Sequence, residues 1–244
     1  QFLWTGADYL GEAREWPSRG SSSGLLDLCS FVKPRGWFRA SLWSEEPVCY
    51  VGAYRKHPRM RFDSMDAWDD WNFEDGEQVR VVCYTNGASA ALFLNGDRVG
   101  DVRPYDSVDG IISWDVPFHA GTLKAVAYDG SGNELCSSEI RTSLRPCSLK
   151  ASSDGVPSSA GRTTHLTVEV LDDNGVPVTL ADNEIRCRIE GPAELLGMEN
   201  GNPSDMSDYT AKARRAYRGR VLAYVRRTGP GPVRVTFSSP LLKP

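Results

Sequence analysis

Short apolar runs that end at an Asn-Gly or Asp-Gly pair recur along most of this chain. Four such pairs lie at residues 86–87, 95–96, 129–130 and 174–175. Asparagine, aspartate and glycine tolerate the positive φ of a tight hairpin turn, so each pair ends one strand and leads into the next. Many short strands separated by such turns predict antiparallel β-sandwiches rather than a parallel α/β sheet.

The strand pattern divides the chain after residue 46 into two parts. It stops near Pro146 and resumes beyond a stretch rich in serine and glycine at residues 151–161. Each part has about 100 residues, the usual size of an immunoglobulin-like domain. We therefore predict one immunoglobulin-like β-sandwich over residues 47–146 and a second over residues 147–244.

Residues 1–46 belong to neither sandwich. The first six residues have the composition of a strand, and a helix is predicted from Lys33 to Trp43, because Pro34 suits a first helical turn. Forty-odd residues cannot bury a core of their own. A strand, a long loop and a helix form one β/α unit of a larger barrel or sheet. The predicted fold is therefore mainly β, with a remnant β/α unit before the two sandwiches.

Composition limits the classes of partner. The chain has 28 basic and 32 acidic residues, a net charge of −4, so it lacks the positive field that attracts nucleic acids. Basic residues do gather over residues 212–227, but they flank a strand of buried type, and we interpret them as charges on exposed edges. No run approaches the roughly 18 apolar residues of a membrane span. We expect neither a nucleic-acid nor a membrane partner.

Metals and cofactors are not expected either. The six cysteines form no C-x-x-C pair, and their spacing neither requires nor excludes disulfides. Cys83 and Cys187 lie in apolar strand patterns, which predicts buried free thiols. Six acidic residues between residues 63 and 75 could bind calcium, but tryptophans interrupt them and the spacing fits no EF-hand. We predict instead that this acidic segment leads into a strand, with its carboxylates in solvent and its aromatic residues packed.

Four stretches resemble glycoside hydrolase family 2, the family of β-galactosidases and β-glucuronidases. Residues 2–12, FLWTGADYLGE, are similar to the motif F-x-W-T-G-F-D-Y-x-G-E of its bacterial members. Residues 21–33, SSSGLLDLCSFVK, are similar to S-x-x-G-I-x-D-x-x-G-F-x-K. Stretches within residues 68–100 and 182–220 resemble the two immunoglobulin-like domains that follow the catalytic barrel. The resemblance implies that residues 1–46 are strand eight, loop and helix eight of a (β/α)8 barrel.

The resemblance also implies where the catalytic residues of the enzyme lie. A retaining glycosidase uses two glutamates about 5 Å apart, and in this family both lie on earlier barrel strands. Neither Glu12 nor Glu45 occupies a matching position, so no catalytic residue is expected in this chain. Two positions depart from the family pattern: Ala7 replaces an aromatic residue and Ser30 replaces a glycine.

Four residues are expected to bind substrate in the intact enzyme: Trp4, Asp8, Glu12 and Trp16. The indole of Trp4 suits the apolar face of a pyranose, and the carboxylates of Asp8 and Glu12 suit sugar hydroxyls. Each has a structural alternative. Trp4 and Trp16 could pack in a core, and the two acids could cap loops by bonding nearby backbone.

We therefore expect the C-terminal part of a retaining β-galactosidase-like enzyme, inactive alone, that acts as pocket wall and scaffold. Its partners would be a β-glycoside sugar and the N-terminal catalytic portion, and oligomers are compatible with this arrangement. Family relatives are often exported to the periplasm or beyond. One alternative is a non-catalytic carbohydrate-binding or adhesive immunoglobulin-like module. Another is a separate chain that complements a catalytic fragment.

Overall fold

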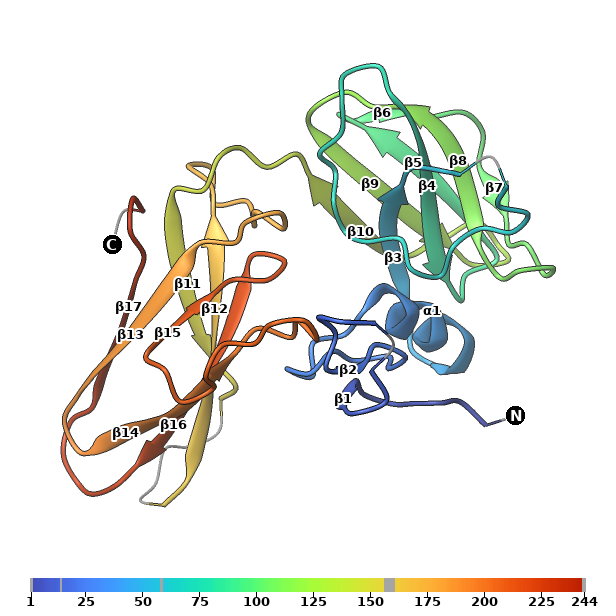
Figure 1. The fold of residues 1–244 in the computed structure, drawn as a ribbon. Coiled ribbons are helices and arrows are strands. Elements are labelled where there is room, and N and C mark those ends of the chain that lie inside the picture. Colours follow the sequence, from blue (N-terminus) through green and yellow to red (C-terminus); the bar gives the residue numbers. More distant parts are fainter. Residues whose placement is uncertain (1, 14, 58, 156–160, 243–244) are drawn as a thin grey trace. The chain divides into compact units, whose positions relative to one another are not determined.

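The computed structural model describes residues 2–13, 15–57, 59–155 and 161–242, and the chain divides into two compact units (Figure 1). One unit combines Gln1–Phe31 with Ser143–Pro244, and the other is Val32–Thr142. The structure thus shares residues 1–46 between the two units. That these residues end a catalytic barrel stays a prediction.

The unit Val32–Thr142 contains helix α1 (Pro34–Trp43) and two antiparallel sheets. The first sheet has the order β3-β4-β8, formed by Cys49–Tyr54, Gln78–Thr85 and Ile112–Pro117. The second has the order β10-β9-β5-β6, with β7 beside β5. Its strands are β5 (Ser89–Leu94), β6 (Asp97–Arg98), β7 (Arg103–Pro104), β9 (Thr122–Tyr128) and β10 (Glu134–Arg141). Apolar side chains of both sheets form one buried core, which confirms the predicted sandwich.

Helix α1 covers the outer face of the first sheet. In β4, Val81 and Cys83 belong to the core between the sheets, whereas Val82 and Tyr84 belong to a second buried cluster with Phe38 of α1. The rings of Phe38 and Tyr84 meet edge to face at 5.5 Å. Since alternate residues of a strand point to opposite faces, β4 is apolar on both faces from Val81 to Tyr84 because both faces are covered there.

The other unit contains the second sandwich. One sheet has the order β11-β12-β16-β14, and the other has the order β15-β13-β17. The strands are β11 (Ser148–Ser153), β12 (Thr163–Leu171), β13 (Glu184–Glu190), β14 (Ala193–Glu199), β15 (Ala213–Arg215), β16 (Arg220–Arg227) and β17 (Arg234–Ser238). Side chains of both sheets share one core, so the second predicted sandwich is also confirmed.

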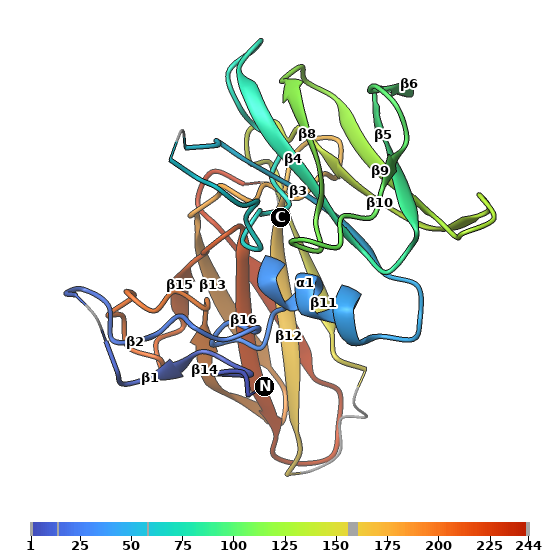
Figure 2. The same cartoon turned by 90° about the vertical axis from the view of Figure 1, so that its right-hand side faces the viewer.

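The N-terminal segment of this unit has little regular structure. Strands β1 (Tyr9–Leu10) and β2 (Gly20–Ser21) pair antiparallel, and Ala7 makes an isolated parallel bridge to Leu26. Residues 2–6 carry no strand in the described chain, although their composition favours one. A strand needs a hydrogen-bonded neighbour, and no described strand lies beside these residues. Figure 2 shows the segment beside the loop that follows β14.

All six cysteines are thiols rather than disulfides, and Cys83 and Cys187 are buried as predicted. Burial raises the pKa of the Cys187 thiol to about 11, so this thiol is protonated at neutral pH. In the acidic stretch, Asp63 pairs with Arg80 at 3.1 Å and Asp66 accepts a hydrogen bond from Arg35 at 2.6 Å. These two carboxylates therefore attach the acidic stretch to an arginine of β4 and an arginine of α1.

Asp172 ties the start of the second sandwich to its first turn. Its carboxylate accepts hydrogen bonds from the backbone N–H groups of Leu144, Asn174 and Val176, at 2.8, 2.8 and 2.9 Å. Desolvation opposes ionisation of this buried group, but the three N–H donors outweigh it and hold its pKa below the usual 3.8. The carboxylate therefore stabilises the fold in its ionised form.

Replacing Asp172 with Asn should lower the free energy of unfolding by about 1.5–3 kcal/mol at pH 7. An amide offers one acceptor oxygen, and its NH2 group would face an N–H donor. Because the folded pKa is depressed, the wild-type advantage is complete above the unfolded pKa and is lost as pH falls through the folded pKa. Urea denaturation of both proteins from pH 7 to pH 2.5 measures this. An energy difference that does not narrow below about pH 4 would contradict the assignment.

Candidate functional site

An exposed aromatic pair and a carboxylate meet near the N-terminus. Trp4 is 70% exposed, and its indole Nε1–H donates to the hydroxyl of Tyr9 at 3.1 Å. The Tyr9 hydroxyl in turn donates to the carboxylate of Glu12. The two rings meet edge to face, with centroids 6.4 Å apart. This Trp4–Tyr9–Glu12 group offers an apolar surface beside hydrogen-bonding oxygens.

Local backbone geometry brings these side chains together. Gly11 has φ +100°, which favours glycine, and Glu12 follows with φ 48°. The chain therefore turns sharply after β1, and Glu12 returns toward Tyr9. A second glycine, Gly24, lies so close to the segment that a Cβ there would be 2.3 Å from the Asp8 nitrogen, so a side chain does not fit.

Asp8 belongs to this scaffold. It is only 8% exposed, and its Oδ1 accepts the backbone N–H of Gly24 at 2.8 Å. The structure therefore places Asp8 in the loop-capping position that was its alternative role. Trp16 is 79% exposed and precedes a cis bond to Pro17. Among the four predicted substrate-binding residues, the described hydrogen bonds join Trp4 and Glu12 through Tyr9.

A hollow of about 520 Å³ lies beside Glu12. Residues from two distant parts of the chain line it: Glu12, Glu15, Ser18, Gly20, Ser21, Ser22, Pro203 and Ser204. The first six belong to the N-terminal segment, and the last two belong to the loop between β14 and β15. We call residues 200–208 the 200–208 loop. No motif in the sequence indicates that this loop belongs to the site.

Arg19 joins the N-terminal segment to this loop region. Its backbone N–H donates to the carbonyl of Pro203 at 2.8 Å, and its Nη2 donates to the Tyr209 hydroxyl at 2.9 Å. The Arg19 guanidinium also lies over the Tyr209 ring, 5.3 Å from its centroid, an attractive cation–π geometry. These contacts hold the two walls of the hollow together.

A buried ion pair orders the loop itself. The Arg214 side chain is fully buried, and its Nη1 lies 3.1 Å from Oδ2 of Asp205. Asp205 also accepts hydrogen bonds from Asn200 and Ser207. Desolvation raises the pKa of Asp205, but the Ser207 hydrogen bonds and the Arg214 charge lower it below its usual value. Among the basic residues predicted on exposed edges, Arg215 and Arg226 form surface ion pairs with Asp182 and Glu194, whereas Arg214 is buried.

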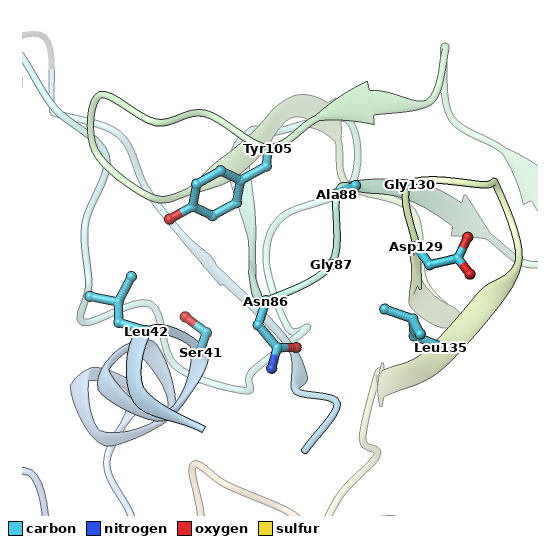
Figure 3. A pocket seen from close by; sticks show the side chains of 9 residues that line it. All are labelled: Ser41, Leu42, Asn86, Gly87, Ala88, Tyr105, Asp129, Gly130 and Leu135. Carbon is cyan, nitrogen blue, oxygen red and sulfur yellow. The ribbon is translucent and has the colours of Figure 1, made fainter. Parts of the chain in front are cut away.

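A second hollow, of about 510 Å³, lies in the unit Val32–Thr142 (Figure 3). Tyr105 and Asp129 lie on opposite sides of it. Most of its polar groups are already engaged. The Asn86 amide donates to the carbonyls of Ser44 and Glu46, and Asp129 accepts from its own turn at Ser131 and Asn133. Few groups remain to orient a polar ligand there.

Within the described ranges, no three or more His, Cys, Asp or Glu side chains gather as a metal site. None of the helices that the structure describes is long and apolar enough to cross a membrane. The Trp4–Tyr9–Glu12 group presents an aromatic surface beside hydrogen-bonding oxygens. This composition matches the apolar and hydroxyl faces of a sugar.

Comparisons with known proteins indicate the family. The family described as glycoside hydrolase family 2 C-terminal domain 5 matches residues 147–244, and a domain of unknown function, DUF4982, matches residues 76–136. Beta-galactosidase BoGH2A of Bacteroides ovatus is 31% identical over 245 residues, which cover 98% of this chain and 27% of that protein. The chain thus spans about a quarter of that relative's length.

Two solved structures are similar over nearly the whole chain. A beta-glycosidase from Bacteroides vulgatus is 28% identical with a TM-score of 0.87, covering 100% of this chain and 30% of that one. A glycosyl hydrolase family 2 member from Bacteroides cellulosilyticus is 28% identical with a TM-score of 0.88, covering 99% of this chain and 34% of that one.

Fold and site thus define a protein of two β-sandwiches with a sugar-compatible aromatic surface. The chain belongs to glycoside hydrolase family 2 and corresponds to the C-terminal portion of its members.

Proposed function

We propose that this chain is the C-terminal part of a retaining, β-galactosidase-like glycosidase and forms one wall of its sugar pocket. The exposed Trp4–Tyr9–Glu12 group is the observation that carries the proposal. In this proposal residues 1–46 complete a (β/α)8 barrel, and the catalytic glutamates lie in the N-terminal portion. The sandwiches over residues 47–146 and 147–244 brace the barrel and take part in oligomer assembly.

Within the site, Trp4 stacks on the apolar face of the sugar, and Glu12 accepts one of its hydroxyls. Tyr9 holds both side chains through its hydroxyl, which accepts from Trp4 and donates to Glu12. Asp8 positions the segment through Gly24 and does not itself need to contact the sugar. Trp16 lies exposed on the loop that follows and edges the same pocket.

One observation weighs against a free-standing carbohydrate-binding or adhesive module. Such a module would present a row of exposed aromatic side chains on one sheet face. On the described strands β3–β17, every Phe, Tyr and Trp side chain is buried or half-buried. The large rings Trp71, Trp114 and Tyr84 lie fully inside. The burial of these aromatic side chains favours a scaffold role for the two sandwiches over a carbohydrate-binding one.

The proposal is tested with the intact enzyme that contains this chain and with the 244-residue chain alone. The intact enzyme should hydrolyse 4-nitrophenyl β-galactoside with retention at the anomeric carbon, and the chain alone should not. Adding the chain to a separately expressed N-terminal portion also tests complementation. Lack of hydrolysis of every β-glycoside by the intact enzyme would refute the proposal.

Replacing Trp4 with Ala in the intact enzyme should reduce kcat/KM about 10- to 100-fold. This corresponds to roughly 1.4–2.7 kcal/mol of lost transition-state stabilisation, because the sugar loses its stacking surface. Trp43→Ala is the matched control, since Trp43 is also exposed but lies on α1. Steady-state kinetics on the aryl galactoside measures both. Equal effects of the two substitutions would contradict a specific role for Trp4.

A further inference from the structure

We propose that the hollow between the N-terminal segment and the 200–208 loop binds a neutral sugar unit of an oligosaccharide substrate. The last sandwich would then select substrate as well as brace the barrel. This inference rests on the proposed function, because it assumes that the intact protein acts on β-glycosides. It adds a ligand class and a second wall, formed by Pro203 and Ser204.

The chemistry of the lining favours a polyhydroxylated, uncharged ligand. The described lining residues include the carboxylates of Glu12 and Glu15 and four serines, and no lysine or arginine. Carboxylates and hydroxyl oxygens accept hydrogen bonds from sugar hydroxyls. The same carboxylates would repel a uronic acid or a phosphate. A hollow of about 520 Å³ lies within the range of small-molecule sites, about 300–1,000 Å³.

Polar groups in the hollow are available for a ligand. Among the described residues, the structure gives the Ser204 hydroxyl and the Glu15 carboxylate no hydrogen-bond or ion-pair partner. The backbone N–H of Ser204 is already held by Oδ1 of Asn202, at 2.9 Å. The side chain can therefore engage a ligand without disturbing the loop.

The loop is organised before any ligand binds. Asn200 is buried, and its Nδ2 donates to Asp205 at 2.7 Å and to the Arg215 carbonyl at 2.9 Å. The buried Arg214 completes this network through Asp205. A wall that is already ordered loses little conformational entropy when a ligand binds, which favours affinity and selectivity.

The N-terminal wall is fixed to the same loop. The contacts from Arg19 to Pro203 and Tyr209 described above set the distance between the two walls. The described residues that line the hollow therefore belong to one unit, and the Arg19 hydrogen bonds join its two walls. The hollow thus has two walls that hydrogen bonds hold in place without a ligand.

The test uses the intact enzyme with Ser204→Trp, which fills the hollow, and Glu15→Ala, which removes a carboxylate without adding bulk. Ser152→Trp on the exposed strand β11 is the matched control. The substrates are 4-nitrophenyl β-galactoside, a neutral trisaccharide with a terminal β-galactosyl group, and the same trisaccharide with one internal uronic acid. Steady-state kinetics gives kcat and KM for each enzyme variant with each substrate, and circular dichroism confirms that each variant is folded.

We expect Ser204→Trp to reduce kcat/KM for the neutral trisaccharide about tenfold more than for the aryl galactoside, mainly through KM. Glu15→Ala should narrow the wild-type preference for the neutral over the uronate trisaccharide at least threefold. Ser152→Trp should change neither ratio. A wild-type enzyme that hydrolyses these substrates, with both ratios unchanged in both variants, would overturn the sugar site alone. A wild-type enzyme that hydrolyses no β-glycoside would overturn the proposed function and this site with it.

Discussion

Replacing Arg214 with Met is expected to lower the free energy of unfolding of the unit Gln1–Phe31 with Ser143–Pro244 by about 3–5 kcal/mol. The Arg214 side chain is fully buried, and its charge balances Asp205, which is itself largely buried. Removing the arginine leaves a carboxylate in a poorly solvated place with only neutral hydrogen-bond donors. The 200–208 loop should lose its order as a result.

Arg215→Met is the control, because it changes the same residue type one position further along β15. Arg215 pairs with Asp182 at the surface, and such exposed pairs contribute about 0–1 kcal/mol. Urea denaturation followed by far-ultraviolet circular dichroism measures both variants. Hydrogen exchange of β12, β14 and β16 assigns the loss to this unit. Similar losses for the two substitutions would show that burial of the pair is not the cause.

Replacing Trp71 with Ala should destabilise the unit Val32–Thr142 by about 3–5 kcal/mol. The Trp71 side chain is fully buried, and its ring meets Phe118 edge to face at 5.0 Å. Its indole N–H donates to the His119 carbonyl at 3.1 Å. Alanine leaves a cavity among these rings and an unpaired carbonyl, and both cost stability.

Trp71→Phe should cost less than Trp71→Ala, because a ring still fills most of the space, and Trp43→Ala should cost little, because Trp43 is 63% exposed. Hydrogen exchange of β4 and β8 reports the stability of this unit separately from the other. If Trp43→Ala destabilised the unit as much as Trp71→Ala, the core assignment would be wrong.

Much of the fold could be predicted from the sequence because hairpin signals and apolar runs are local. The Asn86-Gly87 and Asp129-Gly130 pairs follow β4 and β9 as expected, and α1 begins at Pro34. These features depend on the φ preferences of a few neighbouring residues and on side-chain alternation.

The candidate site was harder to predict because long-range contacts form it. Arg19 and Tyr209 meet across 190 residues of sequence, and no local pattern indicates that pairing. Tyr9 was visible within the family-like motif, but its role depends on the turn at Gly11 that returns Glu12 to it. The burial of Arg214 was missed because its neighbours Arg215 and Arg218 suggested an exposed basic edge.

The covering of β4 by α1 has a consequence for domain exchange between related enzymes. A chimaera joined at the start of β3 would carry the sandwich without its helix. Without Phe38, the sandwich in the chimaera would expose an apolar patch that is prone to aggregate. This patch would consist of Tyr50, Val82 and Tyr84. Helix α1 and the sandwich should therefore be exchanged together, and the junction of such a chimaera should lie before Pro34 so that this patch stays covered.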